Sequence, residues 1–246
     1  MTVFTSLTRS ELRLFLREPM LVFFSLMFPT VLVLILGCVP AFREPTPGLG
    51  GLRVVDVYAA VAVVFTLASL GLNVLPLALV TYRERGILRR IATTPVRPVA
   101  LLGAQVVMNL LVAIVSVALM LGASRLVFDV ALPRRPLSFL VAFLLCAGVA
   151  FTLGLLVSAR ARTGKAANGI GTLLFFPLMF FAGLWTPREV FPGVLRRISD
   201  LSPLGAAERA VHDALAGSWP AWGSVTVLVA YTSVFGLTAA KLFRWE

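Results

Sequence analysis

Apolar residues run through this chain in stretches of about 20 positions, separated by short charged or turn-rich segments. A helix of that length crosses the roughly 30 Å hydrocarbon core of a bilayer. The stretches lack the two-residue alternation of membrane barrel strands. The pattern therefore predicts an all-α membrane protein with six transmembrane helices. Their expected bounds are Met20–Ala41, Val57–Val80, Val99–Leu121, Leu137–Ala159, Ala167–Thr186 and Trp219–Ala240.

Composition agrees with this pattern. The chain is 59% hydrophobic and only 13% charged, whereas a soluble domain has about 25% charged residues. These values exclude a soluble core and predict a single membrane domain over residues 1–246. Cys38 and Cys146 both fall within spans and are poor candidates for a disulfide.

The basic residues predict the orientation. With the N-terminus inside, the inner segments hold 13 basic residues and four acids, and the outer segments hold nine and seven. Because cytoplasmic loops carry the excess of Lys and Arg, both termini are expected in the cytoplasm of a multi-pass protein of the cell membrane. The net charge of +11 then reflects topology and contact with anionic lipid, and no nucleic-acid binding is expected.

Two segments outside the spans are expected to be helical. Residues 1–19 combine apolar positions with Arg9, Arg13 and Arg17, which is typical of a helix lying in the inner interface. Simple positive-inside flanking explains the same arginines. Residues 187–218 hold two apolar patterns too short to span, punctuated by Pro192 and Pro203. They are expected to dip into the outer leaflet, or to cap the bundle, as a re-entrant pair.

The inner segment 82–98 is longer and more basic than a simple turn requires. It is long enough for two to three helical turns, and it allows two interpretations. It forms either a cytoplasmic helix that receives force from a soluble partner or an interfacial anchor facing anionic headgroups. Gly86 would cost about 1 kcal/mol inside a short helix, so it predicts a bend between the second span and this segment.

The spans contain no Asp or Glu that could relay protons, which argues against proton coupling by this chain. Their polar residues include Asn73, Gln105, Asn109 and Asn168, which either form a weakly polar wall or make interhelical hydrogen bonds. Pro29, Pro76 and Pro177 are either pivots along a cavity or static kinks.

Aromatic and small residues give two further patterns. Phenylalanines gather around Phe175 and Phe176, as either a substrate wall or an aromatic belt. The fourth span repeats small residues every four positions, which predicts close helix packing. These residues are Ser138, Ala142, Cys146, Ala150, Gly154 and Ser158.

Four motifs, taken in order, resemble the permease subunit of a type-2 ABC (ATP-binding cassette) exporter, the group that includes drug, polysaccharide and lipid export permeases. They are Arg17-Glu18-Pro19 leading to Phe28-Pro29; Glu84-Arg85-Gly86-Ile87-Leu88-Arg89-Arg90 followed by Thr94-Pro95; Phe176-Pro177-Leu178-Met179-Phe180-Phe181-Ala182-Gly183 running into Pro187 and Pro192; and Ser202-Pro203-Leu204. Gly205-Ala206-Ala207 departs from the bulkier residues that relatives often carry there.

The resemblance implies an exporter of amphipathic small molecules, such as a drug, an antibiotic or a lipid-like compound. It implies a cytoplasmic ABC ATPase dimer and a second permease, identical or similar, as partners. ATP and Mg²⁺ would bind the ATPase, since this chain has no G-x-x-x-x-G-K-[ST] loop and is expected to hold no cofactor. The residues expected to contact the ATPase are Arg83, Glu84, Arg85, Gly86, Ile87, Leu88, Arg89, Arg90 and Ile91.

The candidate substrate path consists of Phe28, Pro29, Asn73, Asn109, Phe175, Phe176 and Pro177. No catalytic or metal site is expected, and His212, the only histidine, is expected to be a solvated surface residue. One rival function, an ATP-independent channel or secondary carrier, would need ion-coordinating or titratable groups in the spans. A second rival, an intramembrane enzyme acting on lipid, would need acids, His or Ser clustered at one depth.

Overall fold

The computed structural model describes residues 3–49, 51–87 and 98–242. Within these ranges the protein is helical and forms no named strand. Six helical segments there are long and apolar enough to cross a membrane, so the predicted all-α class and the six spans are confirmed. The third span departs most from its predicted end, because its helix continues to Phe128 instead of ending at Leu121. The six spans are Pro19–Gly37, Val54–Glu84, Ala100–Phe128, Pro136–Arg160, Gly164–Phe181 and Trp222–Leu242.

The elements follow one another in a simple order. They are α1 (Val3–Leu16), α2 (Pro19–Val22), the π-helical η1 (Phe23–Met27), α3 (Phe28–Gly37), the short turns η2 (Pro40–Arg43) and η3 (Pro47–Leu49), α4 (Val54–Ser69), the π-helical η4 (Leu70–Val74), α5 (Leu75–Glu84), α7 (Pro98–Phe128), α8 (Pro136–Arg160), α9 (Gly164–Phe181), the short turn η5 (Arg188–Val190), α10 (Gly193–Leu201), α11 (Pro203–Leu215) and α12 (Trp222–Leu242).

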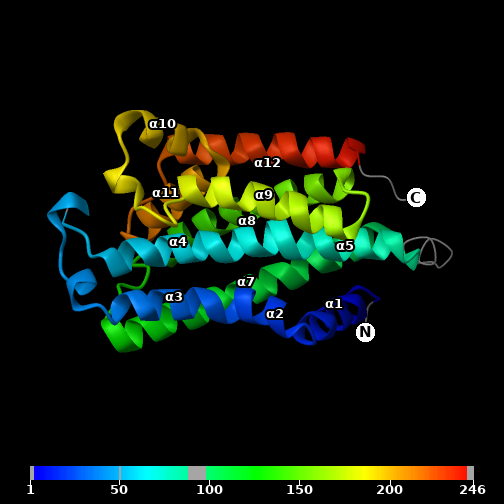
Figure 1. Ribbon diagram of the computed structural model, residues 1–246, viewed down its shortest axis with the longest axis horizontal. Helices are drawn as coiled ribbons and strands as arrows, with labels where there is room; N and C mark the ends of the chain where they lie inside the picture. The colour runs from blue at the N-terminus through cyan, green and yellow to red at the C-terminus, as the bar shows by residue number, and fades with distance from the viewer. Residues whose placement is uncertain (1–2, 50, 88–97, 243–246) are drawn as a thin grey trace.

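The second span, α4–η4–α5, is the centre of the bundle. Of its most apolar window 83% is buried, against 22% for the first span and 11% for the last. Figure 1 shows α3 and α7 on one side of it and α9 and α12 on the other. α3 packs on α7, and α12 packs on α8. The second span contacts α3, α7, α8, α9 and α11. Any movement of it must therefore displace these neighbours.

The two ends of the bundle carry different segments (Figure 1). α1, the end of α5 and the α8–α9 connection lie at one end, and η2, η3, α10 and α11 lie at the other. This arrangement agrees with the predicted alternation of inner and outer segments. We use "inner" and "outer" for these two ends; the orientation in the membrane stays a prediction from the charge distribution.

The prolines of the first two spans follow π-helical turns. The N–H groups of Phe28 and Leu75 each donate to a carbonyl five residues earlier, instead of four. Pro29 and Pro76 come directly after these turns. Proline has no N–H and its ring collides with the preceding turn, and a widened turn relieves both defects. Pro177, by contrast, lies inside α9, which continues to Phe181.

The segment 187–218 forms two short helices that differ in burial. α11 packs on α4, α8, α9 and α12 and is largely buried, whereas α10 exposes Val194 and Leu201. A Cβ atom on Gly205 would lie 2.2 Å from the carbonyl oxygen of Ser199. Small residues at the start of α11 thus allow it to approach α10, which gives a physical reason for Gly205-Ala206-Ala207.

The small-residue stripe of the fourth span packs as predicted. All six of its residues are buried within α8. α8 contacts α4, α5, α11 and α12 through closely spaced backbones. Because small side chains allow this approach, the stripe is a packing surface.

Candidate functional site

The inner end of the second span is connected to three other elements by consecutive residues. Tyr82 donates a hydrogen bond from its hydroxyl to Oε2 of Glu11 in α1, at 2.6 Å. Arg83 donates to the carbonyl of Ala161, just after α8. Glu84 accepts a hydrogen bond of 3.0 Å from the N–H of Gly164, the first residue of α9. A carboxylate at a helix N-terminus is also favoured by the helix dipole.

The predicted ATPase-contact segment, 82–98, begins with these same residues. α5 ends at Glu84, and Gly86 has a φ of +66°, so the chain turns where the glycine predicts a bend. Arg83 and Glu84, both expected to contact the ATPase, bind other parts of this chain instead of standing free. Arg85 is exposed, and Ile87 is half-buried. Leu88, Arg89, Arg90 and Ile91 lie outside the described residues, and the coupling role stays a prediction.

Glu11 is the buried acid of the N-terminal helix. It is only 6% exposed, and its Oε2 accepts a second hydrogen bond of 2.6 Å from Nε2 of Gln105 in α7. Burial raises the pKa of Glu11, and the hydrogen bond from Tyr82 opposes this shift. The sequence analysis counted Glu11 only as an inner flanking charge. Its position four residues from both Leu7 and Phe15 was the available signal, since that spacing places all three on one helix face.

Seven aromatic rings form a continuous series across the bundle. It runs Phe23, Phe24, Phe28, Phe65, Phe175, Phe176 and Trp185, and successive ring centroids are 5.0–5.9 Å apart. Three of these residues belong to the predicted substrate path: Phe28 in the first span, and Phe175 and Phe176 in the fifth. Phe65 of the central span joins them, and the sequence analysis missed it because no local pattern distinguishes it from other apolar residues of α4.

The remaining residues of the predicted path lie apart from one another. Asn73, in η4, accepts a 3.5 Å hydrogen bond from Thr172 of α9. Asn109 is fully buried and donates to the carbonyl of Gln105 in its own helix, while its Oδ1 has no hydrogen-bond partner among the described residues. Pro29 is buried, whereas Pro177 is exposed. The structure thus joins the aromatic members of the path and leaves the others separate.

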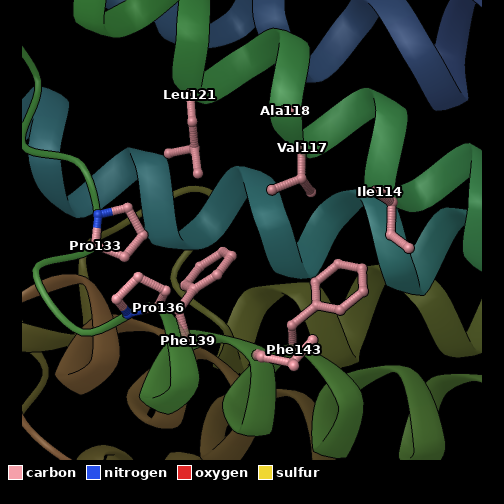
Figure 2. Close-up of a pocket in the computed structure, with 9 residues that line it drawn as sticks. Ile114, Val117, Ala118, Leu121, Pro133, Pro136, Phe139 and Phe143 are labelled. Carbon is pink, nitrogen blue, oxygen red and sulfur yellow. The ribbon is translucent and has the colours of Figure 1, made fainter.

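An apolar cavity of about 400 Å³ lies between α7 and α8. Figure 2 shows side chains from both helices and from the connection between them pointing into it. Ile114 and Leu140 of its wall are about half exposed, so the cavity reaches the lateral surface of the bundle. Its lining is Ile114, Val117, Ala118, Leu121, Pro133, Pro136, Phe139, Leu140 and Phe143.

The outer end contains a buried arginine that the sequence analysis counted only as a loop charge. Arg188 is 6% exposed and donates to Ser199 at 2.8 Å, to Glu208 at 2.7 Å and to Asp200. Ser199 in turn donates to the carbonyl of Phe181, at the end of α9. Burial raises the pKa of Glu208, and Arg188 opposes this shift. Arg188 therefore connects η5, α10 and α11 to the fifth span.

His212, expected to be a solvated surface residue, is partly exposed and lies beside a buried acid. Its side chain is 23% exposed, and its Nδ1 lies 4.0 Å from Oε1 of the buried Glu208. The two residues are one helical turn apart in α11, a spacing that places them on the same face. The sequence analysis overlooked Glu208 because its burial depends on the packing of α11 among the spans.

These observations define a multi-pass helical membrane protein whose central span is connected at its inner end to its neighbours. The family model of the ABC-2 type transporter matches residues 2–215. The chain therefore belongs to the ABC-2 type transporter family and is the membrane subunit of an ABC transporter, which implies partnership with an ABC ATPase. It is also 24% identical, over 184 residues, to the "Putative transport permease YvfS" of Bacillus subtilis (strain 168), an alignment that covers 74% of each chain.

Proposed function

We propose that this chain is the permease subunit of an ATP-driven exporter of amphipathic small molecules, such as a drug, an antibiotic or a lipid-like compound. It acts in the cell membrane with both termini in the cytoplasm, beside a second permease. A separate ATPase dimer holds ATP and Mg²⁺ and docks on residues 82–98. The second permease is needed because six helices enclose little of a path by themselves.

One observation carries the coupling part of the proposal. Tyr82, Arg83 and Glu84 contact α1, the end of α8 and the start of α9 in succession. A force applied to the segment that follows α5 therefore reaches all of these elements at once. Rigid-body movement of packed helices is a common way for such a force to open and close a path.

Two features support an apolar or amphipathic substrate. The aromatic series crosses from the first span to the fifth, and aromatic faces suit apolar molecules and organic cations. The lateral cavity between α7 and α8 is apolar and reaches the surface that faces lipid. Among the described spans, acids occur only near the two ends of the second span, at Asp56 and Glu84. No acid lies deeper in a span, where it could couple transport to protons, and this disfavours the secondary carrier.

The first experiment is to purify the tagged chain in mild detergent from its native membrane and identify what co-elutes. We expect a stoichiometric ATPase that is lost when Arg89 and Arg90 are both replaced by Glu. The matched control is the same double replacement at Arg134 and Arg135, an adjacent exposed pair in the connection between α7 and α8. This control should retain the ATPase.

Two results would contradict the proposal. A chain that moves solute in vesicles without any ATPase would be a channel or carrier. Equal retention of the ATPase by both double variants would remove the coupling role of segment 82–98, which would then be an interfacial anchor.

A further inference from the structure

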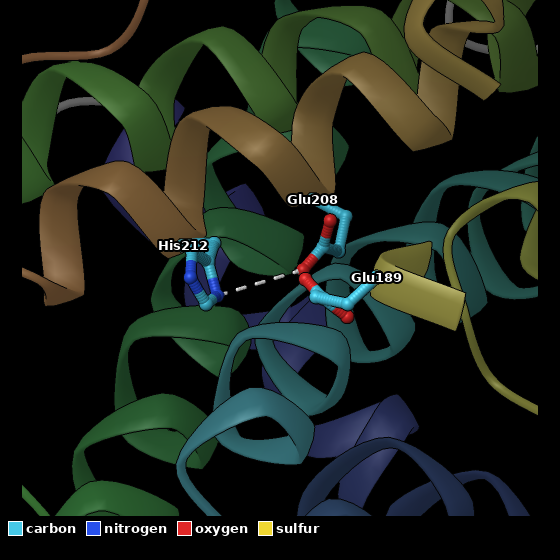
Figure 3. A group of neighbouring side chains, drawn as sticks. All are labelled: Glu189, Glu208 and His212. Carbon is cyan, nitrogen blue, oxygen red and sulfur yellow. Dashed lines mark ion pairs between the residues drawn. The ribbon is translucent and has the colours of Figure 1, made fainter. Parts of the chain in front are cut away.

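Three metal-ligating side chains meet at the outer end of the bundle. Glu189 comes from η5, and Glu208 and His212 come from one face of α11. Each offers one ligand atom, and these atoms all lie within 4.8 Å of one another. Figure 3 shows the two carboxylates and the imidazole pointing toward a common point. Glu189 belongs to a different element from Glu208 and His212, so only tertiary packing brings the three side chains together.

Two carboxylate oxygens of this cluster have no hydrogen-bond partner among the described residues. They are Oε2 of Glu189 and Oε1 of Glu208, and both atoms are buried. Glu208 as a whole is 1% exposed. A buried carboxylate oxygen without a donor is costly, and native proteins rarely leave one without a water or an ion beside it. The unpartnered oxygen of Glu208 thus points to a ligand.

Arg188 fixes the orientation of Glu208 without occupying the free oxygen. Its Nη1 donates to Oε2 of Glu208 at 2.7 Å, so that Oε1 is turned toward His212. At 4.0 Å, Nδ1 of His212 is too far from Oε1 for a hydrogen bond. Two ligands bound to one ion at about 2.1 Å lie roughly 3–4 Å apart. A modest contraction of the cluster would therefore place its atoms around one ion.

The carboxylates of the cluster itself supply the negative charge that a cation requires. A cavity of about 730 Å³ beside the cluster is lined by three arginines and three of the nearby acids, and Glu208 adds a fourth acid. The three arginines and four acids together carry one net negative charge, and this sum includes the proposed ligands Glu189 and Glu208. The cavity also gives an ion access to the site. Its charged lining residues are Arg188, Glu189, Arg196, Asp200, Arg209 and Asp213.

We propose that Glu189, Glu208 and His212 form a binding site for a divalent first-row transition metal ion, with Zn²⁺ as the representative ion. Two carboxylates and one imidazole form a nitrogen and oxygen donor set that suits such ions, whereas Ca²⁺ and Mg²⁺ prefer oxygen alone. Three protein ligands leave at least one coordination position open toward the cavity. The bound ion clamps η5 to α11 and so holds α11 among the spans.

The test uses the full chain, purified through a tag that contains no histidine and freed of metal with a chelator. Zn²⁺ is then titrated by calorimetry, and the unfolding temperature is recorded with and without it. We expect one Zn²⁺ per chain and a higher unfolding temperature, because an ion that binds only the folded state stabilises it. Co²⁺ should give visible absorption bands that report direct coordination.

Variants separate this site from adventitious binding. Glu189→Gln and His212→Gln should each weaken Zn²⁺ binding at least tenfold, as loss of a direct ligand should cost no less than loss of a supporting contact. Glu208→Gln is avoided because it removes the counter-ion of Arg188. Asp213→Asn is the matched control: this acid lines the same cavity beside His212, but it does not belong to the cluster.

Two outcomes would overturn the site. One is the absence of stoichiometric Zn²⁺ binding by the unmodified chain. The other is equal binding by the unmodified chain, Glu189→Gln and His212→Gln. These measurements need neither transport nor an ATPase, so they test the metal site independently of the proposed export function.

Discussion

The carbonyl oxygen of Gly71 packs directly on Gly154, so closely that a Cβ atom on Gly154 would lie 1.8 Å from it. The next carbonyl, that of Leu72, packs in the same way on Gly171 of α9, where a Cβ atom would lie 2.0 Å away. Both carbonyls belong to η4, the widened turn that precedes Pro76. The central span is therefore held between α8 and α9 at the place where its own helix is least regular.

Replacement of Gly154 by Ala should destabilise the protein. The added methyl group has no space, and overpacking of this kind costs about 1–3 kcal/mol of unfolding free energy. Gly148→Ala on the same helix is the control, because its Cβ atom would meet only the side chain of Thr232, at 3.4 Å. The unfolding temperatures of the two variants in detergent measure their stability relative to the unmodified chain. Equal stability of the two variants would contradict the close contact.

Glu11 predicts a pH dependence of stability. Burial raises its pKa above the ordinary value of 4.5. At a pH between 4.5 and this raised pKa, the folded chain therefore holds a proton that the unfolded chain has released. The stability that this proton contributes is complete below the ordinary value and is lost as the pH rises through the raised pKa. The neutral Glu11→Gln variant lacks this dependence and keeps an acceptor oxygen for Tyr82 and Gln105.

Unfolding temperatures measured across acidic to neutral pH test this prediction. The stability of Glu11→Gln relative to the unmodified chain should increase with pH. Glu18→Gln, which changes an exposed acid two residues beyond α1, is the control. A pH profile of Glu11→Gln parallel to that of the unmodified chain would show that Glu11 does not titrate in this window.

The buried ion pair of Arg188 with Glu208 predicts that the stability effects of substitutions at these two residues do not add. Arg188→Met alone leaves the buried Glu208 without its partner and should cost about 3–5 kcal/mol. Adding Glu208→Leu should recover much of this loss, because an apolar pair does not require compensation of a buried charge. Thermal unfolding of the two single variants and the double variant forms the cycle. Additive losses would mean that the ion pair has no significant coupling energy.

Phe65 should affect transport more than assembly. Phe65→Leu keeps the site apolar but breaks the aromatic series between Phe28 and Phe175. If the series lines the path, substrate-stimulated ATP hydrolysis by the complete transporter should fall several-fold while expression stays near normal. Phe235→Leu on α12, whose ring contacts only Tyr231 among the ring pairs of the described residues, is the control. An equal effect of both variants would remove Phe65 from the path.

Several parts of the candidate site were predictable from local pattern. The bend at Gly86 followed from the cost of glycine in a short helix, and the close packing of α8 followed from its small residues. Phe28 and Phe176 were named from their motifs, and Phe175 was named from the phenylalanines that gather around it. That they share one series was not predictable, because the distance between two spans depends on how all the helices pack.

The sequence by itself determined the class of the protein, the number of spans and their approximate bounds. Hydrocarbon thickness sets the length of a span, and that requirement is readable in any stretch of apolar residues. Only the tertiary structure decided which charges are buried. Glu11, Arg188 and Glu208 resemble other flanking charges in the sequence, and each is enclosed because elements distant in the chain supply its partners and exclude water. Burial of this kind is a property of the packed bundle and has no signature in composition or local periodicity.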